Sequence, residues 1–229
     1  MQTVNADQQA NSPIKSTGHE SSLTTLTTNL RRKRFLLFKS LIAPLPRPLR
    51  ILDVGGTIKF WEKMEFTNEE MQITVLNVRR YEITYSNFTS VIGDARNMKE
   101  FQDKEFDIVY SNSVIEHVGT FEQQRQMAEE IQRIGKRYFL QTPNRYFPIE
   151  PHFALPFFQF LPLGLRIYLS THIKNGWGNK MKDKQKAIHF VSSIRLMREK
   201  ELKLLFPGAR IYKEKFFGLT KSFTVYGGW

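Results

Sequence analysis

The chain has 229 residues, of which 41% are hydrophobic and 24% charged, and these proportions are those of an ordinary globular protein. It contains no cysteine, which excludes disulfide frameworks, thiolate nucleophiles and thiolate metal sites. Its net charge of +12 favours an anionic partner such as nucleic acid, an anionic membrane surface or a phosphate-bearing substrate, although a solvated basic surface has the same composition.

The first 48 residues precede the predicted domain. Residues 1–28 are rich in Gln, Asn, Ser and Thr and have no apolar run, which predicts a disordered polar tail and neither a signal peptide nor a membrane span. Residues 29–48 carry a predicted short helix, Leu30–Leu41, and a proline-rich linker that ends it. No later stretch reaches the roughly 18 apolar residues of a spanning helix. We therefore expect a cytoplasmic protein.

From residue 49 onward, short apolar runs alternate with helical patterns. We predict strands at 50–54, 73–78, 89–92, 106–110 and 136–141, helices at 58–66 and 121–134, and a helical turn at 98–101. The chain then ends with a predicted helix at 198–206 and two strands at 210–217 and 222–226. This order predicts one α/β domain over 49–229, with a Rossmann-like, doubly wound, mostly parallel sheet and a C-terminal antiparallel hairpin strand.

One segment, at about 145–188, interrupts the alternation with four prolines and many aromatic residues, and we interpret it as an insertion. Its residues 153–169 are unusually apolar. They predict a lid helix packed on the domain, or alternatively an acceptor pocket for a hydrophobic substrate. Peripheral contact of 153–169 with a membrane surface, helped by nearby basic residues, and contact with a partner protein remain alternatives.

Polar residues or glycines stand at the ends of four predicted strands. They are Asp53, Gly55 and Gly56 after the first strand, Asn77 after the second, Gly93, Asp94 and Ala95 after the third, and Ser111 and Asn112 after the fourth. In a doubly wound sheet these strand ends converge on one crevice. The Gly-x-Gly-x-x-Gly cradle of dinucleotide enzymes is missing, and Asp53 would repel a pyrophosphate. The crevice therefore favours a ligand without phosphate.

The motifs ILDVGG, the GDA of 93–95, FDIVYSNSVIEHV and the terminal strand pair resemble those of class I S-adenosylmethionine-dependent methyltransferases. The resemblance implies a role for each matching residue: Asp53, Gly55 and Gly56 at the methionine part of S-adenosylmethionine, Asn77 at the ribose hydroxyls, Asp94 and Ala95 at the adenine, and Ser111 and Asn112 in a loop that closes over the cofactor. The chain departs from the family pattern in two places. Thr57 and Lys59 replace two glycines of the loop, and Asn77 replaces an acidic residue, which removes charge assistance from the ribose contact.

The protein must align donor and acceptor and, where required, remove a proton. Candidate bases are Glu116 and His117 after the fourth strand, and Glu150 and His152 after the fifth. We select His117, His152 and Glu150 as catalytic candidates, because histidine titrates near neutral pH and the last two lie in the insertion. A packing or capping role is the alternative for His117, and Glu150 and His152 could simply hold their loop. The spacing of these residues predicts no metal site.

The sequence thus predicts an S-adenosylmethionine-dependent methyltransferase that O-methylates a small-molecule, lipid-linked or glycan acceptor. A nucleic-acid methyltransferase is an alternative, favoured by the basic charge and by the run Arg31–Arg34. Against it, the fourth strand ends in Ser-Asn-Ser-Val and does not resemble the Asn/Asp-Pro-Pro-aromatic sequence of base-methylating enzymes. The third possibility is a catalytically inactive binding protein with this fold.

Overall fold

The computed structural model describes residues 22–67, 70–174 and 180–229. Its central feature is a seven-stranded sheet with the strand order β3-β2-β1-β4-β5-β9-β8. The strands are β1 (Leu49–Val54), β2 (Met71–Asn77), β3 (Phe88–Ile92), β4 (Phe106–Asn112), β5 (Gly135–Pro143), β8 (Arg210–Phe216) and β9 (Leu219–Gly227). The first five run parallel, while β9 is antiparallel to both β5 and β8. The predicted doubly wound sheet with a C-terminal hairpin is therefore confirmed.

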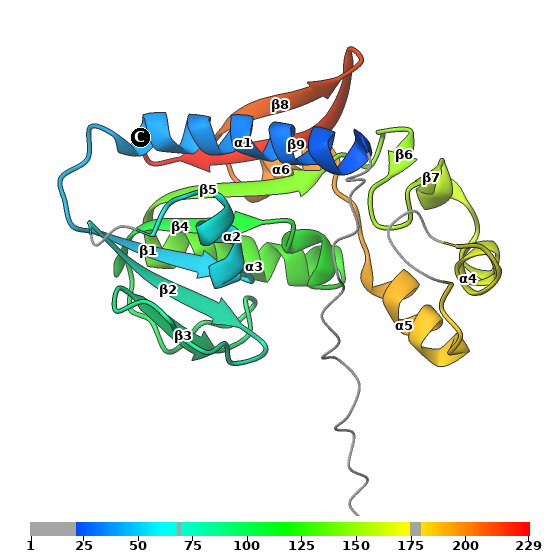
Figure 1. Cartoon of the computed structure of the whole chain (residues 1–229), viewed down its shortest axis with the longest axis horizontal. Coiled ribbons are helices and arrows are strands. Elements are labelled where there is room, and N and C mark those ends of the chain that lie inside the picture. Colours follow the sequence, from blue (N-terminus) through cyan, green and yellow to red (C-terminus); the bar gives the residue numbers. More distant parts are fainter. Residues whose placement is uncertain (1–21, 68–69, 175–179) are drawn as a thin grey trace, which may run out of the picture.

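Helices cover both faces of this sheet (Figure 1). The helices on the domain are α1 (Ser22–Ile42), α2 (Ile58–Lys63), η1 (Ile115–His117), α3 (Phe121–Ile134) and α6 (Glu199–Leu205). Successive residues of β1 point to opposite faces of the sheet and so to the two cores. Leu52 faces the core under α3 and α6, and Ile51 faces the core under α1 and α2. Both side chains are fully buried. The carboxyl ends of the strands are thus held between two packed layers.

A capping box explains why α3 begins where the sequence predicted. Thr120 and Gln123 form a capping box, in which the side chain of each accepts from the backbone N–H of the other. Met127, Ile131 and Ile134 lie along one face of the helix and are fully buried. The helix therefore has a fixed start beside the carboxyl end of β4.

The predicted insertion contains several short elements. These are β6 (Ile149–Glu150), β7 (Leu155–Pro156), η2 (Phe158–Phe160), α4 (Leu163–His172) and α5 (Lys184–Ser193), which extends past the predicted boundary. Figure 1 places them beyond the carboxyl ends of the central strands. Phe153 and Phe158 stack at the centre of a small separate core with Val191. The segment 153–169 is therefore not a single lid helix: it forms a strand, a 3-10 turn and the start of α4.

Two other sequence expectations need adjustment. The first helix begins at Ser22, so residues 22–28, assigned to the tail, are helical, while residues 1–21 lie outside the described part of the chain. Residues 98–101 form a turn and not a helical turn. Residues 175–179 of the predicted insertion, Asn-Gly-Trp-Gly-Asn, also lie outside the described residues. Within the described chain, no helix is long and apolar enough to cross a membrane.

Candidate functional site

A cavity of about 410 Å³, which we call the strand-end cavity, opens at the carboxyl ends of β1, β2 and β3. It brings together four of the residues predicted to contact the cofactor: Gly55, Asn77, Asp94 and Ala95. The remaining lining residues are Leu76, Val78, Gly93, Arg96, Ser113, Val114, His117 and Val118. The predicted convergence of strand ends on one crevice therefore occurs for three strands and for the loop after β4.

The turn after β1 requires glycine at its first position. Gly55 has φ +76°, a left-handed conformation that costs other residues energy. A Cβ atom at this position would lie 2.6 Å from a methyl carbon of Val114, closer than real carbon atoms approach. The backbone of the turn and the loop after β4 therefore touch directly across the floor of the strand-end cavity.

Asp53 lies beneath this turn and not on the cavity wall. Its carboxylate is almost completely buried, and Trp61 Nε1 donates a 2.7 Å hydrogen bond to Oδ2, while Oδ1 has no hydrogen-bond partner. Burial raises the pKa of Asp53 to about 7, against the opposing effect of the Trp61 hydrogen bond. A side chain on Gly56 would collide with this carboxylate. Asp53 thus fixes the underside of the turn.

Three more of the predicted cofactor residues also stand outside the lining of the strand-end cavity: Gly56, Ser111 and Asn112. Ser111 is buried and donates its hydroxyl to the carbonyl of Val54, which ties β4 to β1. The neighbouring Ser113 does line the cavity, and it has φ +57°. Contact of Asp53, Gly56, Ser111 and Asn112 with a cofactor stays a prediction.

Two polar side chains on the cavity wall are already engaged within the chain. Asn77 Nδ2 donates to the carbonyl of Gly56 at 3.1 Å, which leaves its own carbonyl oxygen as an acceptor. Asp94 pairs with the guanidinium of Arg96 at 2.5 Å, and this hydrogen bond lowers the pKa of Asp94. Arg96 could not be identified from the sequence, because an arginine in a turn has no distinctive pattern.

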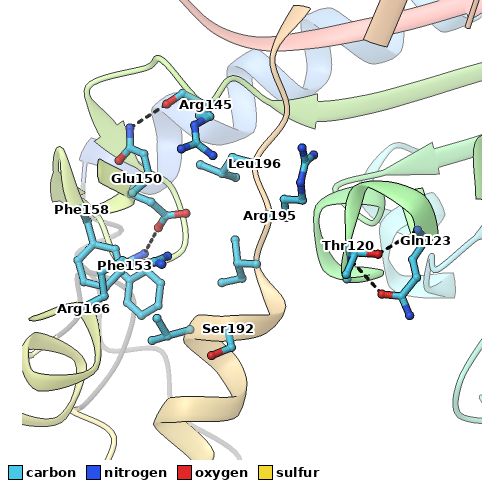
Figure 2. Close-up of a pocket in the computed structure, with 14 residues that line it drawn as sticks. Thr120, Gln123, Arg145, Glu150, Phe153, Phe158, Arg166, Ser192, Arg195 and Leu196 are labelled. Atoms are coloured by element: carbon cyan, nitrogen blue, oxygen red, sulfur yellow. Dashed lines mark hydrogen bonds between the residues drawn. The ribbon is translucent and has the colours of Figure 1, made fainter. Parts of the chain in front are cut away.

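A second cavity, of about 540 Å³, lies between the insertion and the start of α3, and we call it the insertion cavity. Figure 2 shows Arg145, Glu150, Phe153 and Arg166 on one side of it and Thr120 and Gln123 on the other. The remaining lining residues are Gly119, Phe158, Gln159, Val191, Ser192, Ile194, Arg195 and Leu196. The insertion therefore forms a cavity wall, with both aromatic and charged groups.

Two of the three arginines in the insertion cavity form no ion pair among the described residues, although the charge of Glu150 acts on Arg166. Arg195 pairs with Glu201 at 2.5 Å and donates to Gln124. Arg145 and Arg166 form no ion pair among the described residues, and each has a buried Nε without a hydrogen-bond partner. Burial, and then the charge of Arg145, lower the pKa of Arg166. This cavity therefore has a local excess of positive charge.

A chain of three side chains joins the two cavities. Glu150, on the wall of the insertion cavity, contacts His152 Nδ1 through Oε1 at 2.7 Å. His152 Nε2 lies 3.0 Å from Nε2 of His117, which lines the strand-end cavity. All three residues selected as catalytic candidates are therefore brought together, although their role stays a prediction. Glu150 also accepts from the backbone N–H of His152 and of Phe153, so it shapes the loop as well.

The two histidines differ in basicity because their neighbours differ. Burial and the charge of His152 lower the pKa of His117 to about 4, so this ring is neutral at physiological pH. Burial also lowers the pKa of His152, but the hydrogen bond and charge of Glu150, together with the charge of Glu116, outweigh it and raise the net pKa above its ordinary value. His152 is therefore the more basic of the two rings.

Comparison with known proteins now adds to this geometry. A family model described as "Methyltransferase domain" matches residues 53–138, which run from Asp53 through the whole strand-end cavity to β5. This part of the chain is therefore similar to a methyltransferase domain. Two uncharacterized proteins of Mycobacterium tuberculosis, from strains CDC 1551 / Oshkosh and ATCC 25618 / H37Rv, are each 34% identical over 65 residues, or 28% of this chain. The match spans 22% of the length of these curated relatives.

Solved structures share the fold of the methyltransferase domain at low sequence identity. The DszA carbon methyltransferase is 16% identical, with a TM-score of 0.57 over 92% of this chain and 56% of that one. Magnesium protoporphyrin IX methyltransferase from Synechocystis PCC 6803, with bound SAH, is 10% identical, with a TM-score of 0.53 over 92% of this chain and 89% of that one. These likenesses establish the fold of the domain.

The family match ends at Tyr138, before the insertion begins. The side chains of the insertion cavity that face α3 across it, Arg145, Glu150 and Arg166, therefore lie outside the matched segment. The matched segment thus contains the whole lining of the strand-end cavity, whereas most of the lining of the insertion cavity lies beyond it.

Proposed function

We propose that this chain is an S-adenosylmethionine-dependent methyltransferase that methylates a hydroxyl oxygen of an acceptor bearing an anionic group. The observation that carries the proposal is the pair of cavities joined by His117, His152 and Glu150. The strand-end cavity belongs to the methyltransferase domain and suits the cofactor, and the insertion cavity suits the acceptor. The junction between them is where a methyl group would pass from one to the other.

The residues of the strand-end cavity fit the cofactor. Its volume of about 410 Å³ lies within the usual range of ligand pockets, about 300–1,000 Å³. Gly55 presents bare backbone there, which allows a ligand to approach closely. The free carbonyl oxygen of Asn77 would accept from the ribose hydroxyls, and Asp94 beside Ala95 would accept from the adenine amino group. Asp53 would hold the turn and place negative charge below the cationic part of the cofactor.

S-adenosylmethionine, when bound, supplies an electrophilic methyl group on a positively charged sulfur. The side chains at the junction would do the rest. His152 in its neutral form would accept the proton of the acceptor hydroxyl at Nε2, once that hydroxyl replaces the contact with His117. Glu150 would hold the Nδ1–H of His152 and stabilise the resulting imidazolium. Because His117 stays neutral, it would add no competing positive charge at the junction.

The charge of the insertion cavity supports an anionic acceptor. Arg145 and Arg166 form no ion pair among the described residues, and a carboxylate or phosphate group would pair with their guanidinium groups. Glu150 is the one acidic residue on the described wall of this cavity, and it already accepts hydrogen bonds from His152 and Phe153. The fixed positive charge would thus orient the acceptor with its hydroxyl toward His152.

A lipid-linked acceptor has separate support from the surface of the insertion. Phe157, Phe160, Leu163, Leu165 and Tyr168 are between 44% and 59% exposed, so residues 153–169 present apolar groups to the surroundings. Such a surface suits the apolar part of an amphipathic acceptor and peripheral contact with a membrane. Small-molecule and glycan acceptors that carry a carboxylate or phosphate require only the insertion cavity.

The test is methyl transfer from labelled S-adenosylmethionine to a panel of hydroxylated carboxylic acids, phosphate esters and lipid-linked phosphates, with neutral alcohols, RNA and DNA alongside. We expect transfer to anionic small or lipid-linked acceptors. Arg166→Gln should raise the KM for the acceptor by about 10- to 100-fold, which is the cost of a lost hydrogen bond to a charged group. Arg210→Gln, at an exposed position on β8, is the charge-matched control. Equal rates with neutral alcohols, or transfer to nucleic acid alone, would contradict the proposal.

A further inference from the structure

Three side chains with metal-ligating atoms meet at the junction of the methyltransferase domain and the insertion. Glu116 and His117 come from η1, directly after β4, and His152 comes from the loop after β6. One ligand atom from each residue lies within 4.8 Å of the other two. Imidazole nitrogen together with a carboxylate oxygen is a donor set that suits Zn²⁺ and similar divalent transition metals.

The spacing of the two rings is close to that of ligands on one metal ion. Two nitrogen atoms bound to a tetrahedral ion at about 2.0–2.1 Å are separated by roughly 3.3 Å. His117 Nε2 and His152 Nε2 are 3.0 Å apart, and their ring planes are nearly perpendicular. Without a metal, a single proton must lie between these two nitrogen atoms. A cation could take the place of that proton after a small separation of the rings.

Glu116 gives an independent indication that a positive group belongs here. Its side chain is fully buried, and Oε2 accepts a 2.9 Å hydrogen bond from the hydroxyl of Thr142. Its other oxygen, Oε1, is also buried and has no hydrogen-bond partner. A buried carboxylate oxygen without a partner is costly unless a proton or a cation compensates it. The nearby imidazole nitrogens place that cation between Glu116 and the two histidines.

Glu150 supplies the support that a metal-binding histidine usually has. Metal-bound imidazoles donate their other ring N–H to a carboxylate or carbonyl, which fixes the tautomer and the orientation of the ring. His152 Nδ1 lies 2.7 Å from Glu150 Oε1, and this carboxylate is itself 2% exposed and held by two backbone N–H groups. This contact makes Nδ1 the protonated nitrogen and turns the lone pair of Nε2 toward His117.

We propose that Glu116, His117 and His152 form a binding site for a divalent transition metal ion, with Zn²⁺ as the reference ion, which ties the insertion to the methyltransferase domain. The ion takes the place of the proton between the two Nε2 atoms, and His117 carries that proton on Nδ1 instead, so that both rings bind the ion as neutral imidazoles. With three protein ligands, one further coordination position is free for water or for an oxygen of the acceptor, the arrangement of catalytic zinc sites. An acceptor hydroxyl bound at that position would have its pKa lowered by the ion. His152 would then hold the ion through Nε2 and would no longer be the base that removes the proton.

This extension concerns the acceptor end of the proposed function, but metal binding is measured without methyl transfer, so either can fail without the other. The full chain is treated with a chelator and titrated with Zn²⁺ alone by isothermal titration calorimetry. We expect one tight site per chain and a melting temperature that rises with Zn²⁺ and falls again with chelator. His117→Ala and His152→Ala should each remove the tight site. Glu150→Gln should weaken it by about 10- to 100-fold, as loss of such supporting carboxylates does elsewhere.

His189→Ala is the matched control, because His189 is an exposed histidine on α5 and should leave the site intact. Circular dichroism and thermal unfolding establish that each variant is folded. If a variant fails to fold, zinc-edge X-ray absorption of the wild-type chain decides the matter, since the site requires two histidine ligands. Absence of a tight site in wild type, equal affinity in the two histidine variants, or an absorption spectrum without histidine would overturn the proposal.

Discussion

The turn after β1 offers the sharpest test of how the strand-end cavity is built. Gly55→Ala should destabilise the chain by about 2–5 kcal/mol. A left-handed φ of +76° costs an alanine about 1–2 kcal/mol, and crowding against Val114 at 2.6 Å adds about 1–3 kcal/mol, the usual cost of overpacking. Because Val114 lines the cavity, its displacement should also weaken S-adenosylmethionine binding. Denaturant unfolding and calorimetric titration measure the two effects.

Two further variants separate the two contributions to that cost. Gly208→Ala carries the same backbone penalty, at φ +75°, but a Cβ there meets nothing within 4 Å. It should therefore cost only about 1–2 kcal/mol and leave cofactor binding unchanged. Adding Val114→Ala to Gly55→Ala should recover the crowding share in a double-mutant cycle. If Gly55→Ala costs no more than Gly208→Ala, or if Val114→Ala recovers nothing, the proposed contact between turn and loop is wrong.

Three other predictions test the parts around this turn. The pKa of about 7 for Asp53, against an ordinary 3.8, corresponds to about 4 kcal/mol at about 1.4 kcal/mol per pH unit. Since the folded chain holds this proton more tightly, the unfolding free energy of wild type relative to Asp53→Asn should fall by about that amount between pH 4 and pH 8 in urea titrations; a flat difference would contradict the burial. Arg166→Gln should raise the acceptor KM but not the cofactor Kd, and parallel changes in both would refute separate cavities. Thr120→Ala should cost about 1 kcal/mol of stability through loss of the α3 cap, whereas an unchanged unfolding midpoint would show that the cap is dispensable.

The order of strands and helices could be predicted because burial on both faces of the sheet leaves a strong local pattern. Helix α3 was predicted to the residue, since its apolar positions repeat at helical spacing. The same reasoning failed at 98–101. Met98 is fully buried, but its backbone N–H donates to Glu130 and the chain then makes a turn. The apolar residues Met98 and Phe101 are spaced as in a helix because both contact the core, although the chain between them forms a turn.

The candidate site was only partly predictable, for a related reason. Strand ends meet in any doubly wound sheet, so Gly55, Asn77 and Asp94 could be grouped from the sequence alone. His117 and His152 are 35 residues apart, and their contact depends on the path of the insertion, which has no repeating pattern. The same holds for Arg145 and Arg166. Side chains that meet through irregular backbone leave no periodic signal, so the sequence allowed Glu150, His117 and His152 to be selected singly but did not predict their contacts.

The central claim is that S-adenosylmethionine occupies the strand-end cavity, and its most direct test is calorimetric titration of the full chain with this cofactor. We predict saturable binding at one site per chain. Ala95→Trp should abolish it, because Ala95 lines the cavity and an indole would fill it. Ala43→Trp, at an exposed position after α1, should bind as wild type does. Absence of binding at millimolar cofactor in folded wild-type protein, or undiminished binding by Ala95→Trp, would contradict the account.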